Sequence, residues 1–380
     1  MSKILIASFL MVLVASLVFL GQFQTALAKP DNDKRVRVLA DSNEKVSAAL
    51  TKGCDTVRET KGLRALLCPE ETASALGLRE DIRIYKADSA ANEQIGADIV
   101  QSSGNNGEGR KIVVLDTGYN YNHAELASSY LGGKDFVNND NDPLDDNGHG
   151  SHVAGIITGD GVNSAARGVA PAAGIIVGKV LDSEGSGFFS DLVAAIYWAV
   201  DGPDGIAGNK DDFKADAINL SMGTAAPYLY KTFCDGEMPE LTDAIKYAVG
   251  RKVSVVVAAG NYGSGGVSIP GCISYSLTVG AVNSIDKVAS FSGRGKGVDL
   301  SAPGVGLISA GSDSRLYSLE GTSMSTPVVS GTIALIKHEH KWYSANKIRL
   351  VLINTALDLG KEGRDHSYGY GRVVASEAAV

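Results

Sequence analysis

From residue 111 to the end of the chain, short apolar segments alternate with longer segments of helical character. Segments that are apolar along their whole length are typical of strands buried on both faces of a parallel sheet. The expected strands are Lys111–Leu115, Gly174–Val180, Ala217–Leu220, Val253–Ala258 and Leu277–Val282. The expected helices are His149–Thr158, Ser190–Val200, Pro239–Val249, Thr322–Glu339 and Ala345–Leu357. The alternation therefore predicts an α/β fold, a three-layer sandwich with a mostly parallel central sheet between two layers of helices.

Polar residues follow three of the expected strands, namely Asp116, Ser221 and Asn261. Because ligands of parallel sheets bind at the carboxyl ends of the strands, we expect these residues at one edge of the sheet. His149 begins an expected helix, and Ser323 lies in the first turn of the last long helix. A serine nucleophile needs a base within hydrogen-bond reach and an acid that fixes the tautomer of that base. The chain therefore has a candidate for each group at element ends that a parallel sheet brings together.

Each candidate also has a simpler interpretation when it is taken alone. Ser323 could act only as a helix cap, and Asp116 could cap a turn. His149 and His152 could form half of a metal site, but a His-x-x-His pair without a nearby Glu or Cys ligand is weak evidence for zinc. The catalytic interpretation therefore rests on the residues occurring together.

Three short blocks of the sequence resemble the signature blocks of the subtilases, the subtilisin-like serine endopeptidases. The blocks are Asp116-Thr117-Gly118, His149-Gly150-Ser151-His152-Val153-Ala154-Gly155 and Gly321-Thr322-Ser323-Met324-Ser325-Thr326-Pro327. They occur in the order Asp, His, Ser, which is also the order in subtilisins. Two departures are visible, because Ser151 stands where the family usually has Thr, and Ser325-Thr326 where it usually has Ala-Ser. The resemblance implies a subtilisin-like fold and a catalytic Asp116–His149–Ser323 triad that works through an acyl-enzyme.

The same resemblance assigns residues that bind the substrate. Ala258-Ala259-Gly260-Asn261 matches the family's oxyanion block, which implies that the Asn261 side chain donates to the oxyanion; the alternative is a turn residue. Ser221, Met222 and Gly223 resemble the strand whose edge pairs with an extended substrate backbone. Ala258, Ala259 and Gly260 would line the primary specificity pocket, where small residues leave room for a large apolar side chain.

Acidic clusters make calcium the expected cofactor. The stretch from Asp135 to Asp142 resembles the calcium loop of thermitase-like subtilases, in which Asp135, Asp140 and Asp142 would supply ligands. A solvated acidic turn is the alternative. A second cluster, at residues 201–212, lacks the spacing of an EF-hand. Glu125 stands where Asp is usual in the family's strong calcium site, which puts that site in doubt.

Residues 1–28 have the pattern of a secretory signal peptide. Lys3 precedes an apolar run from Ile4 to Leu20, and Ala26-Leu27-Ala28 is typical of a cleavage site. The apolar length alone would also allow a membrane anchor, but the cleavage site favours a secreted protein without one. The sequence contains no second apolar run of spanning length.

Residues 29–88 are predicted to form a separate unit ahead of a peptidase domain at residues 89–380. Residues 35–87 have a βαββαβ pattern, with the last strand expected around Ile82, Ile84 and Ala87. The pattern resembles the family's ferredoxin-like propeptide, which implies a zymogen that is inhibited by its own propeptide and cleaves itself within residues 84–92. A permanent regulatory domain is the alternative.

The four cysteines favour an exported protein with disulfides over a metal site. Cys54 and Cys68 lie symmetrically about Lys61, so a hairpin would place them opposite each other. Cys234 and Cys272 flank the Ser221 and Asn261 region and could form a second disulfide. Buried free thiols are the alternative for both pairs.

The net charge of −8 argues against a nucleic-acid partner. The sequence therefore favours a secreted, monomeric serine endopeptidase that acts on proteins or peptides. A catalytically silent peptide-binding scaffold with the same fold is the alternative; the presence of Asp116, His149, Ser323 and Asn261 disfavours it. A dinucleotide- or phosphate-binding enzyme is disfavoured because the chain has neither a Gly-x-Gly-x-x-Gly motif opening a helix nor a P-loop.

Overall fold

We describe the protein from a computed structural model, in which residues 35–60, 63–80 and 90–380 are described. The chain divides into two compact units, residues 1–84 and 85–380. The signal peptide expected at residues 1–28 lies outside the described residues. So do the strand expected around Ile82–Ala87 and most of the expected cleavage region.

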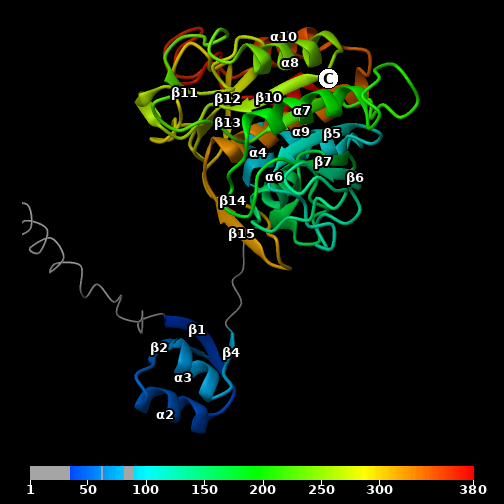
Figure 1. Cartoon of the computed structure of the whole chain (residues 1–380). Helices are drawn as coiled ribbons and strands as arrows, with labels where there is room; N and C mark the ends of the chain where they lie inside the picture. The colour runs from blue at the N-terminus through cyan, green and yellow to red at the C-terminus, as the bar shows by residue number, and fades with distance from the viewer. Residues whose placement is uncertain (1–34, 61–62, 81–89) are drawn as a thin grey trace, which may run out of the picture. The chain divides into compact units, whose positions relative to one another are not determined.

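The first unit is a small antiparallel sheet with helices (Figure 1). Its elements follow one another as β1 (Arg35–Ala40), α2 (Asn43–Thr51), β2 (Asp55–Thr60), β3 (Leu63–Pro69), α3 (Glu70–Ala75) and β4 (Arg79–Glu80). The strand order is β2-β3-β1-β4. Helix α2 begins after Ser42, whose hydroxyl accepts the Lys45 N–H and so satisfies one free donor of the first turn. A disulfide joins Cys54 to Cys68, which confirms the first predicted pair.

The second unit is built around a seven-stranded sheet in the order β13-β12-β10-β8-β5-β7-β6. All neighbouring strands in this sheet run parallel. The strands are β5 (Lys111–Asp116), β6 (Tyr130–Asp135), β7 (Gly174–Lys179), β8 (Ala217–Leu220), β10 (Ser254–Ala258), β12 (Leu277–Val282) and β13 (Leu300–Pro303). All five predicted strands are present, and the predicted α/β fold is confirmed.

Helices cover both faces of this sheet (Figure 1). Alternate residues of β5 point to opposite faces of the sheet. On one face, Ile112 and Val114 pack with α6 (His149–Thr158) and α9 (Thr322–Glu339). On the other face, Val113 and Leu115 pack with α7 (Phe189–Asp201) and α8 (Pro239–Gly250). The remaining helices are α4 (Ala90–Ile95), α5 (Ala97–Ser102), α10 (Ala345–Asn354) and α11 (Ala375–Ala378). In the described part of the chain, no helix has both the length and the apolar character needed to cross a membrane.

Two sheet strands, β6 and β13, are not predicted from the sequence. Both lie at edges of the sheet, where a strand has only one neighbour. Strand β6 contains two glycines and a lysine, and β13 has four residues and ends in Pro303. An edge strand tolerates such residues, so neither segment has the apolar run on which the prediction depends.

The helix predicted at Ala345–Leu357 is too long by one turn, since α10 ends at Asn354. Leu357 instead exchanges two backbone hydrogen bonds with Arg372, so a tertiary contact ends the helix. Short elements complete the unit. They are the 3₁₀ helices η1 (Ser164–Ala166) and η2 (Gly263–Gly265), and the paired strands β9 (Leu229–Tyr230) with β11 (Val267–Ser268) and β14 (Leu307–Ala310) with β15 (Leu316–Leu319).

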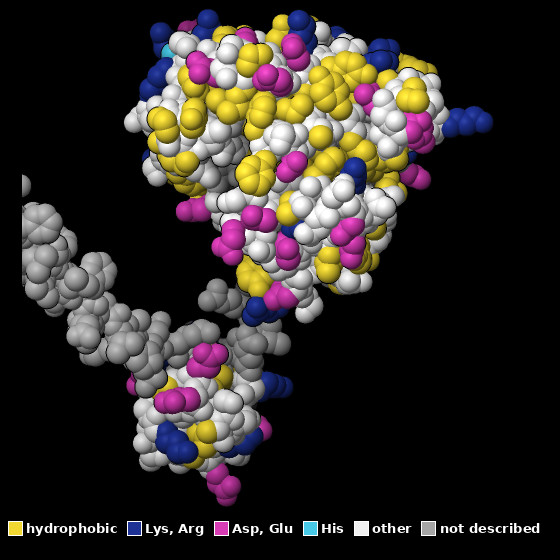
Figure 2. Space-filling view, in the orientation of Figure 1, with side chains coloured by type: hydrophobic (Ala, Val, Ile, Leu, Met, Phe, Trp, Pro, Cys, Tyr) yellow, Lys and Arg dark blue, Asp and Glu magenta, His cyan; other side chains and the backbone are white. Residues whose placement is uncertain are grey.

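Figure 2 shows acidic side chains scattered over the face of the second unit that is in view, with apolar side chains between them. The scattered acidic groups agree with the negative net charge of the chain.

Candidate active site

The structure brings Asp116 and His149 together at the carboxyl edge of the sheet. Asp116 is the last residue of β5, and His149 is the first residue of α6. The helix approaches the Asp116 turn so closely that a Cβ on Gly150 would overlap the carbonyl oxygen of Gly118. Gly118 itself has a φ of 124°, a backbone conformation that favours glycine. Glycines at these two positions therefore allow the acid and the imidazole to meet.

His149 donates a hydrogen bond from Nδ1 to Oδ1 of Asp116 at 2.7 Å. The Asp116 side chain is 0% exposed and that of His149 is 28% exposed. Burial lowers the pKa of His149, but the charge and the hydrogen bond of Asp116, together with the charge of Asp145, outweigh burial and leave the pKa raised. Because Nδ1 carries the proton, Nε2 is the ring nitrogen that can accept one.

Asp145 organises the loop before His149, and the sequence reasoning missed it. Its carboxylate is 4% exposed. It accepts hydrogen bonds from the Thr117 hydroxyl, the Gly148 N–H, and both the N–H and the hydroxyl of Ser151, at 2.6–2.9 Å. Burial raises the pKa of Asp145, but the hydrogen bonds from Ser151, Gly148 and Asn147 outweigh burial and leave the pKa below its usual value. An acidic residue four positions before His149 was the only signal for this role in the sequence.

Ser151 is one of the two departures from the subtilase pattern. Its hydroxyl donates to Asp145 at 2.6 Å and accepts the Asn120 N–H at 2.9 Å. A Thr hydroxyl makes the same bonds, so the substitution keeps the hydroxyl that the loop uses.

His152 lies outside the group formed by Asp116 and His149, although the sequence allowed a pairing with His149. Its Nε2 donates to the carbonyl oxygen of Tyr317 at 3.0 Å. Burial lowers the pKa of His152 to about 4, so the side chain is neutral near pH 7. No group of three or more His, Cys, Asp or Glu residues in the described parts of the chain could hold a metal ion.

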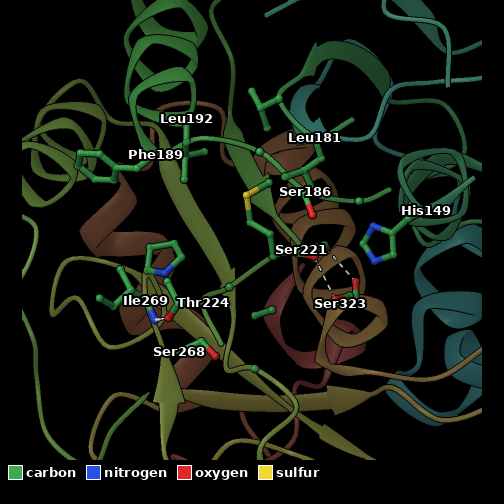
Figure 3. A pocket seen from close by; sticks show the side chains of 18 of the residues that line it. His149, Leu181, Ser186, Phe189, Leu192, Ser221, Thr224, Ser268, Ile269 and Ser323 are labelled. Carbon is green, nitrogen blue, oxygen red and sulfur yellow. Dashed lines mark hydrogen bonds between the residues drawn. The ribbon is translucent and has the colours of Figure 1, made fainter. Parts of the chain in front are cut away.

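Ser323 is the second residue of α9, at the positive end of the helix dipole. Its hydroxyl donates to the carbonyl oxygen of Ser221 at 3.0 Å, and the Ser221 hydroxyl donates to the carbonyl oxygen of Ser323 at 2.7 Å. Figure 3 shows these two bonds, with His149 facing the same cavity. The structure therefore joins Ser323 to the strand end at Ser221.

Asn261 is held beside Ser323 by its carbonyl oxygen. That oxygen accepts the N–H and the hydroxyl of Thr322, each at 2.9 Å. The Thr322 hydroxyl in turn accepts the Gly260 N–H at 3.1 Å. These bonds fix the orientation of the amide, so that its NH₂ group remains available to a ligand.

A cavity of about 790 Å³ contains His149 and Ser323 in its wall, together with Asn261. Five of the six residues predicted to bind substrate also line it, namely Ser221, Met222, Gly223, Ala258 and Gly260. Ala259, the sixth, is not among the lining residues; it is 0% exposed and packs in the apolar core under the sheet. Ala259 follows strand β10, along which alternate side chains point to opposite faces, so its neighbours face the cavity while it faces the core.

The three carboxylates expected to hold calcium take part in separate hydrogen bonds. Asp135 accepts the N–H groups of Val137 and Asn138 at 2.7 and 2.8 Å. Asp142 accepts the Tyr121 hydroxyl at 2.7 Å. In this conformation these oxygens face donors of the chain, and the described residues contain no group of three or more His, Cys, Asp or Glu that could hold a metal ion. Calcium binding by this loop therefore stays a prediction.

The carboxylate of Glu125 also accepts hydrogen bonds from the chain, in this case from the loop that follows α6. Its carboxylate accepts the N–H groups of Gly161, Val162 and Asn163 at 2.8, 3.0 and 2.6 Å. A loop whose N–H groups point inward favours an anion, whereas calcium needs inward-pointing oxygens. The carboxylate of Glu125 therefore fills this loop, and the family's strong calcium site does not fit it.

The second predicted disulfide, Cys234–Cys272, is also present. It joins the segment after β9 to the segment after β11, and Cys234 donates its N–H to the Cys272 carbonyl oxygen at 3.0 Å. Ser268, Ile269 and Pro270 of the second segment line the cavity. The disulfide therefore braces one wall of the site.

Comparison with known proteins agrees with this geometry. A model described as the subtilase family matches residues 107–371. The chain belongs to this family. It is a serine endopeptidase of the subtilisin type.

Two relatives and one solved structure show how far the similarity extends. The chain is 37% identical over 262 residues to a thermophilic serine proteinase of Bacillus sp. (strain AK1), which covers 69% of this chain and 60% of that protein. It is 37% identical over 285 residues to Subtilisin Savinase of Lederbergia lenta, covering 75% of this chain and 96% of the relative. The crystal structure of a cold-adapted subtilisin-like serine proteinase matches with a TM-score of 0.58 and 32% identity, over 71% of this chain and 88% of that one.

Proposed function

We propose that this subtilase hydrolyses peptide bonds of proteins through Asp116, His149 and Ser323, and that it is secreted as a self-processing zymogen. The observation that carries the catalytic part is the hydrogen bond from His149 to the buried Asp116, because His149 lines a cavity together with Ser323 and the oriented amide of Asn261. A catalytically silent scaffold would not need a buried carboxylate fixed on an imidazole.

The reaction follows from the atoms in this cavity. The Ser323 hydroxyl leaves the Ser221 carbonyl oxygen and attacks the scissile carbonyl carbon, while Nε2 of His149 takes its proton. The buried Asp116 carboxylate stabilises the imidazolium that forms. The NH₂ group of Asn261 and the Ser323 N–H donate to the oxyanion. His149 then passes the proton to the leaving amine, and the acyl-enzyme that remains is hydrolysed by a water that His149 activates.

The substrate is proposed to bind as an extended backbone along Ser221, Met222 and Gly223. These residues follow β8 and line the cavity, which supports the proposal that their backbone groups pair with an added strand. Recognition of backbone groups suits an enzyme that accepts many protein sequences.

The processing steps rest on the sequence. Residues 1–28 would be removed on export, and residues 29–88 would act as chaperone and inhibitor of the peptidase domain at residues 89–380 until self-cleavage. The mature enzyme would act outside the cell as a monomer without a membrane anchor. N-terminal sequencing of the secreted, active protein tests this order of events, and a start near Lys29 would contradict the zymogen.

Calcium remains a prediction from the acidic sequence alone, and no step of the reaction depends on it. Asp135, Asp140 and Asp142 would be the ligands only if their loop rearranged on binding. Calorimetric titration of the metal-stripped protein with calcium measures this binding directly.

Labelling with a fluorophosphonate tests the catalytic part. The wild-type processed protein is expected to be labelled, and Ser323→Ala is expected to remain unlabelled. Ser325→Ala is the matched control, because Ser325 lies on the same helix but is buried, and it should be labelled like the wild type. Absence of labelling in the processed wild type would favour the silent scaffold.

A further inference from the structure

The wall of the cavity opposite His149 is formed by the segment from Ser268 to Pro270. Val267 and Ile269 belong to the apolar core beneath the sheet. Ser268 lies between them in the sequence, and alternate residues of an extended segment point in opposite directions. Ser268 lines the cavity, and Figure 3 shows its side chain with Thr224 and Ile269 on the side away from His149.

The hydroxyl of Ser268 is buried without a partner. The residue is 1% exposed, and its Oγ makes no hydrogen bond to any of the residues that the structure describes. A hydroxyl removed from water normally gains a hydrogen bond in exchange, because otherwise its desolvation is not compensated. An unpaired hydroxyl in the wall of a binding cavity is therefore a group that a ligand can satisfy.

Ser268 lies between the two backbone segments that are proposed to bind substrate. A Cβ on Gly260 would overlap its Oγ, and a Cβ on Gly223 would come within 2.7 Å of its Cβ. The Ser268 N–H donates to the carbonyl oxygen of Ala259 at 3.0 Å. Residues 221–223 and 258–260 thus form the two sides of a slot, and Ser268 forms part of its end.

The slot opens beside the reacting groups. The Ser221 carbonyl oxygen contacts the Ser323 hydroxyl at 3.0 Å, and Asn261 directly follows Gly260. A substrate carbonyl that is attacked by Ser323 and bound by Asn261 therefore has its own side chain at the mouth of this slot. This side chain belongs to the residue on the amino side of the scissile bond.

The end of the slot is held in place from two directions. Ser268 pairs with Leu229 in the β9–β11 ribbon, and the Cys234–Cys272 disulfide ties the two segments of that ribbon together. The Thr224 hydroxyl accepts the Ile269 N–H at 3.0 Å. A fixed polar group discriminates between ligands better than a mobile one, because little ordering is needed on binding.

We propose that Ser268 is a specificity-determining residue, which favours substrates whose side chain before the scissile bond ends in a hydrogen-bonding group. A tyrosine or glutamine there would be cleaved faster than phenylalanine or methionine, which have similar shape but no such group. This proposal rests on the proposed function of the same cavity. It adds a polar preference to the expectation that small residues leave room for a large apolar side chain, and that expectation stays a prediction.

Four peptide p-nitroanilides that differ only in the residue before the scissile bond test this proposal. They form two pairs, Tyr with Phe and Gln with Met. Of Phe and Met, the residue that is cleaved faster shows which side-chain length fits the slot. The kcat/KM of the polar peptide is then divided by that of the apolar peptide in the same pair. The polar member is expected to be favoured by about 2- to 12-fold, the range of one neutral hydrogen bond. In Ser268→Ala this ratio should fall to about 1.

The matched control is Ser254→Ala. Ser254 is also buried with an unpaired hydroxyl, but it lies at the opposite end of β10 from the cavity. Its substitution should leave the ratio unchanged. If the wild-type and Ser268→Ala ratios agree within the error of the Ser254→Ala control, Ser268 does not select the substrate. If the processed wild type cleaves none of the four peptides, nor a longer protein substrate, the proposed function fails instead.

Discussion

Replacing Asn261 separates its two roles, because its two amide atoms have different partners. The oxygen accepts the N–H and the hydroxyl of Thr322, and the NH₂ group is the proposed oxyanion donor. Asn261→Ala removes both roles, whereas Asn261→Asp keeps an oxygen that can accept from Thr322 and replaces the donor with a charged carboxylate, which also repels the oxyanion. Removal of one oxyanion donor costs roughly 3–4 kcal/mol, or about 100- to 1,000-fold in kcat. Asn261→Ala should therefore lose activity in this range, and Asn261→Asp should lose at least as much.

The assay is steady-state hydrolysis of a peptide p-nitroanilide, with thermal unfolding as the check on folding. The loss should fall on kcat while KM changes little, because the oxyanion exists only in the transition state and the intermediate. Asn209→Ala, at a half-buried position of a loop that does not line the cavity, is the control and should retain wild-type activity. A kcat within tenfold of wild type for both Asn261 variants would refute the oxyanion role.

The same structure makes three further predictions. Because Asp116 raises the pKa of His149 and the base must be neutral, kcat/KM should fall as the pH drops through a pKa above 6.5. Asp116→Asn should move this acidic limb of the pH profile to lower pH and reduce kcat roughly 10⁴-fold. An acidic limb that stays in place in this variant would contradict the pairing of Asp116 with His149. Glu125→Gln should lower the free energy of unfolding in urea by about 2 kcal/mol, since it loses charge-assisted bonds to three N–H groups; the exposed Glu362→Gln should change it little, and equal effects would count against the carboxylate-filled loop. Loss of the Cys234–Cys272 disulfide, which closes a 38-residue separation, should cost about 4 kcal/mol of unfolding free energy if chain entropy dominates; a Cys234→Ala/Cys272→Ala variant as stable as wild type would show that entropy is offset.

The sequence predicts the central strands because each is apolar along its length. Strands β5, β7, β8, β10 and β12 lie inside the sheet and are covered on both faces, so burial and sequence agree. The edge strands β6 and β13 have only one neighbouring strand, and the glycines and lysine of β6 and the proline of β13 interrupt the apolar pattern that predicts a strand. The end of α10 is set by the backbone pairing of Leu357 with Arg372, which no local pattern indicates.

The candidate site is predictable in part for a similar reason. Asp116, His149 and Ser323 stand at element ends, where a parallel sheet gathers side chains, and their blocks are distinctive. Asp145 and Ser268 escape prediction because their importance depends on tertiary neighbours: the donors around one carboxylate and the two glycines around one hydroxyl. Calcium binding by the acidic loop stays a prediction; composition does not reveal that its carboxylates accept hydrogen bonds from N–H and hydroxyl donors of the chain.

The bond from the Ser323 hydroxyl to the Ser221 carbonyl oxygen links the readiness of the nucleophile to the kind of molecule that binds. In the proposed binding mode, a peptide along residues 221–223 would donate an N–H to this oxygen and so free the hydroxyl to turn toward His149. A small ester has no such N–H, so the Ser323 hydroxyl would still be bonded to the Ser221 carbonyl oxygen when the ester binds. In the proposed mechanism, the backbone of a peptide substrate would therefore also free Ser323 for attack.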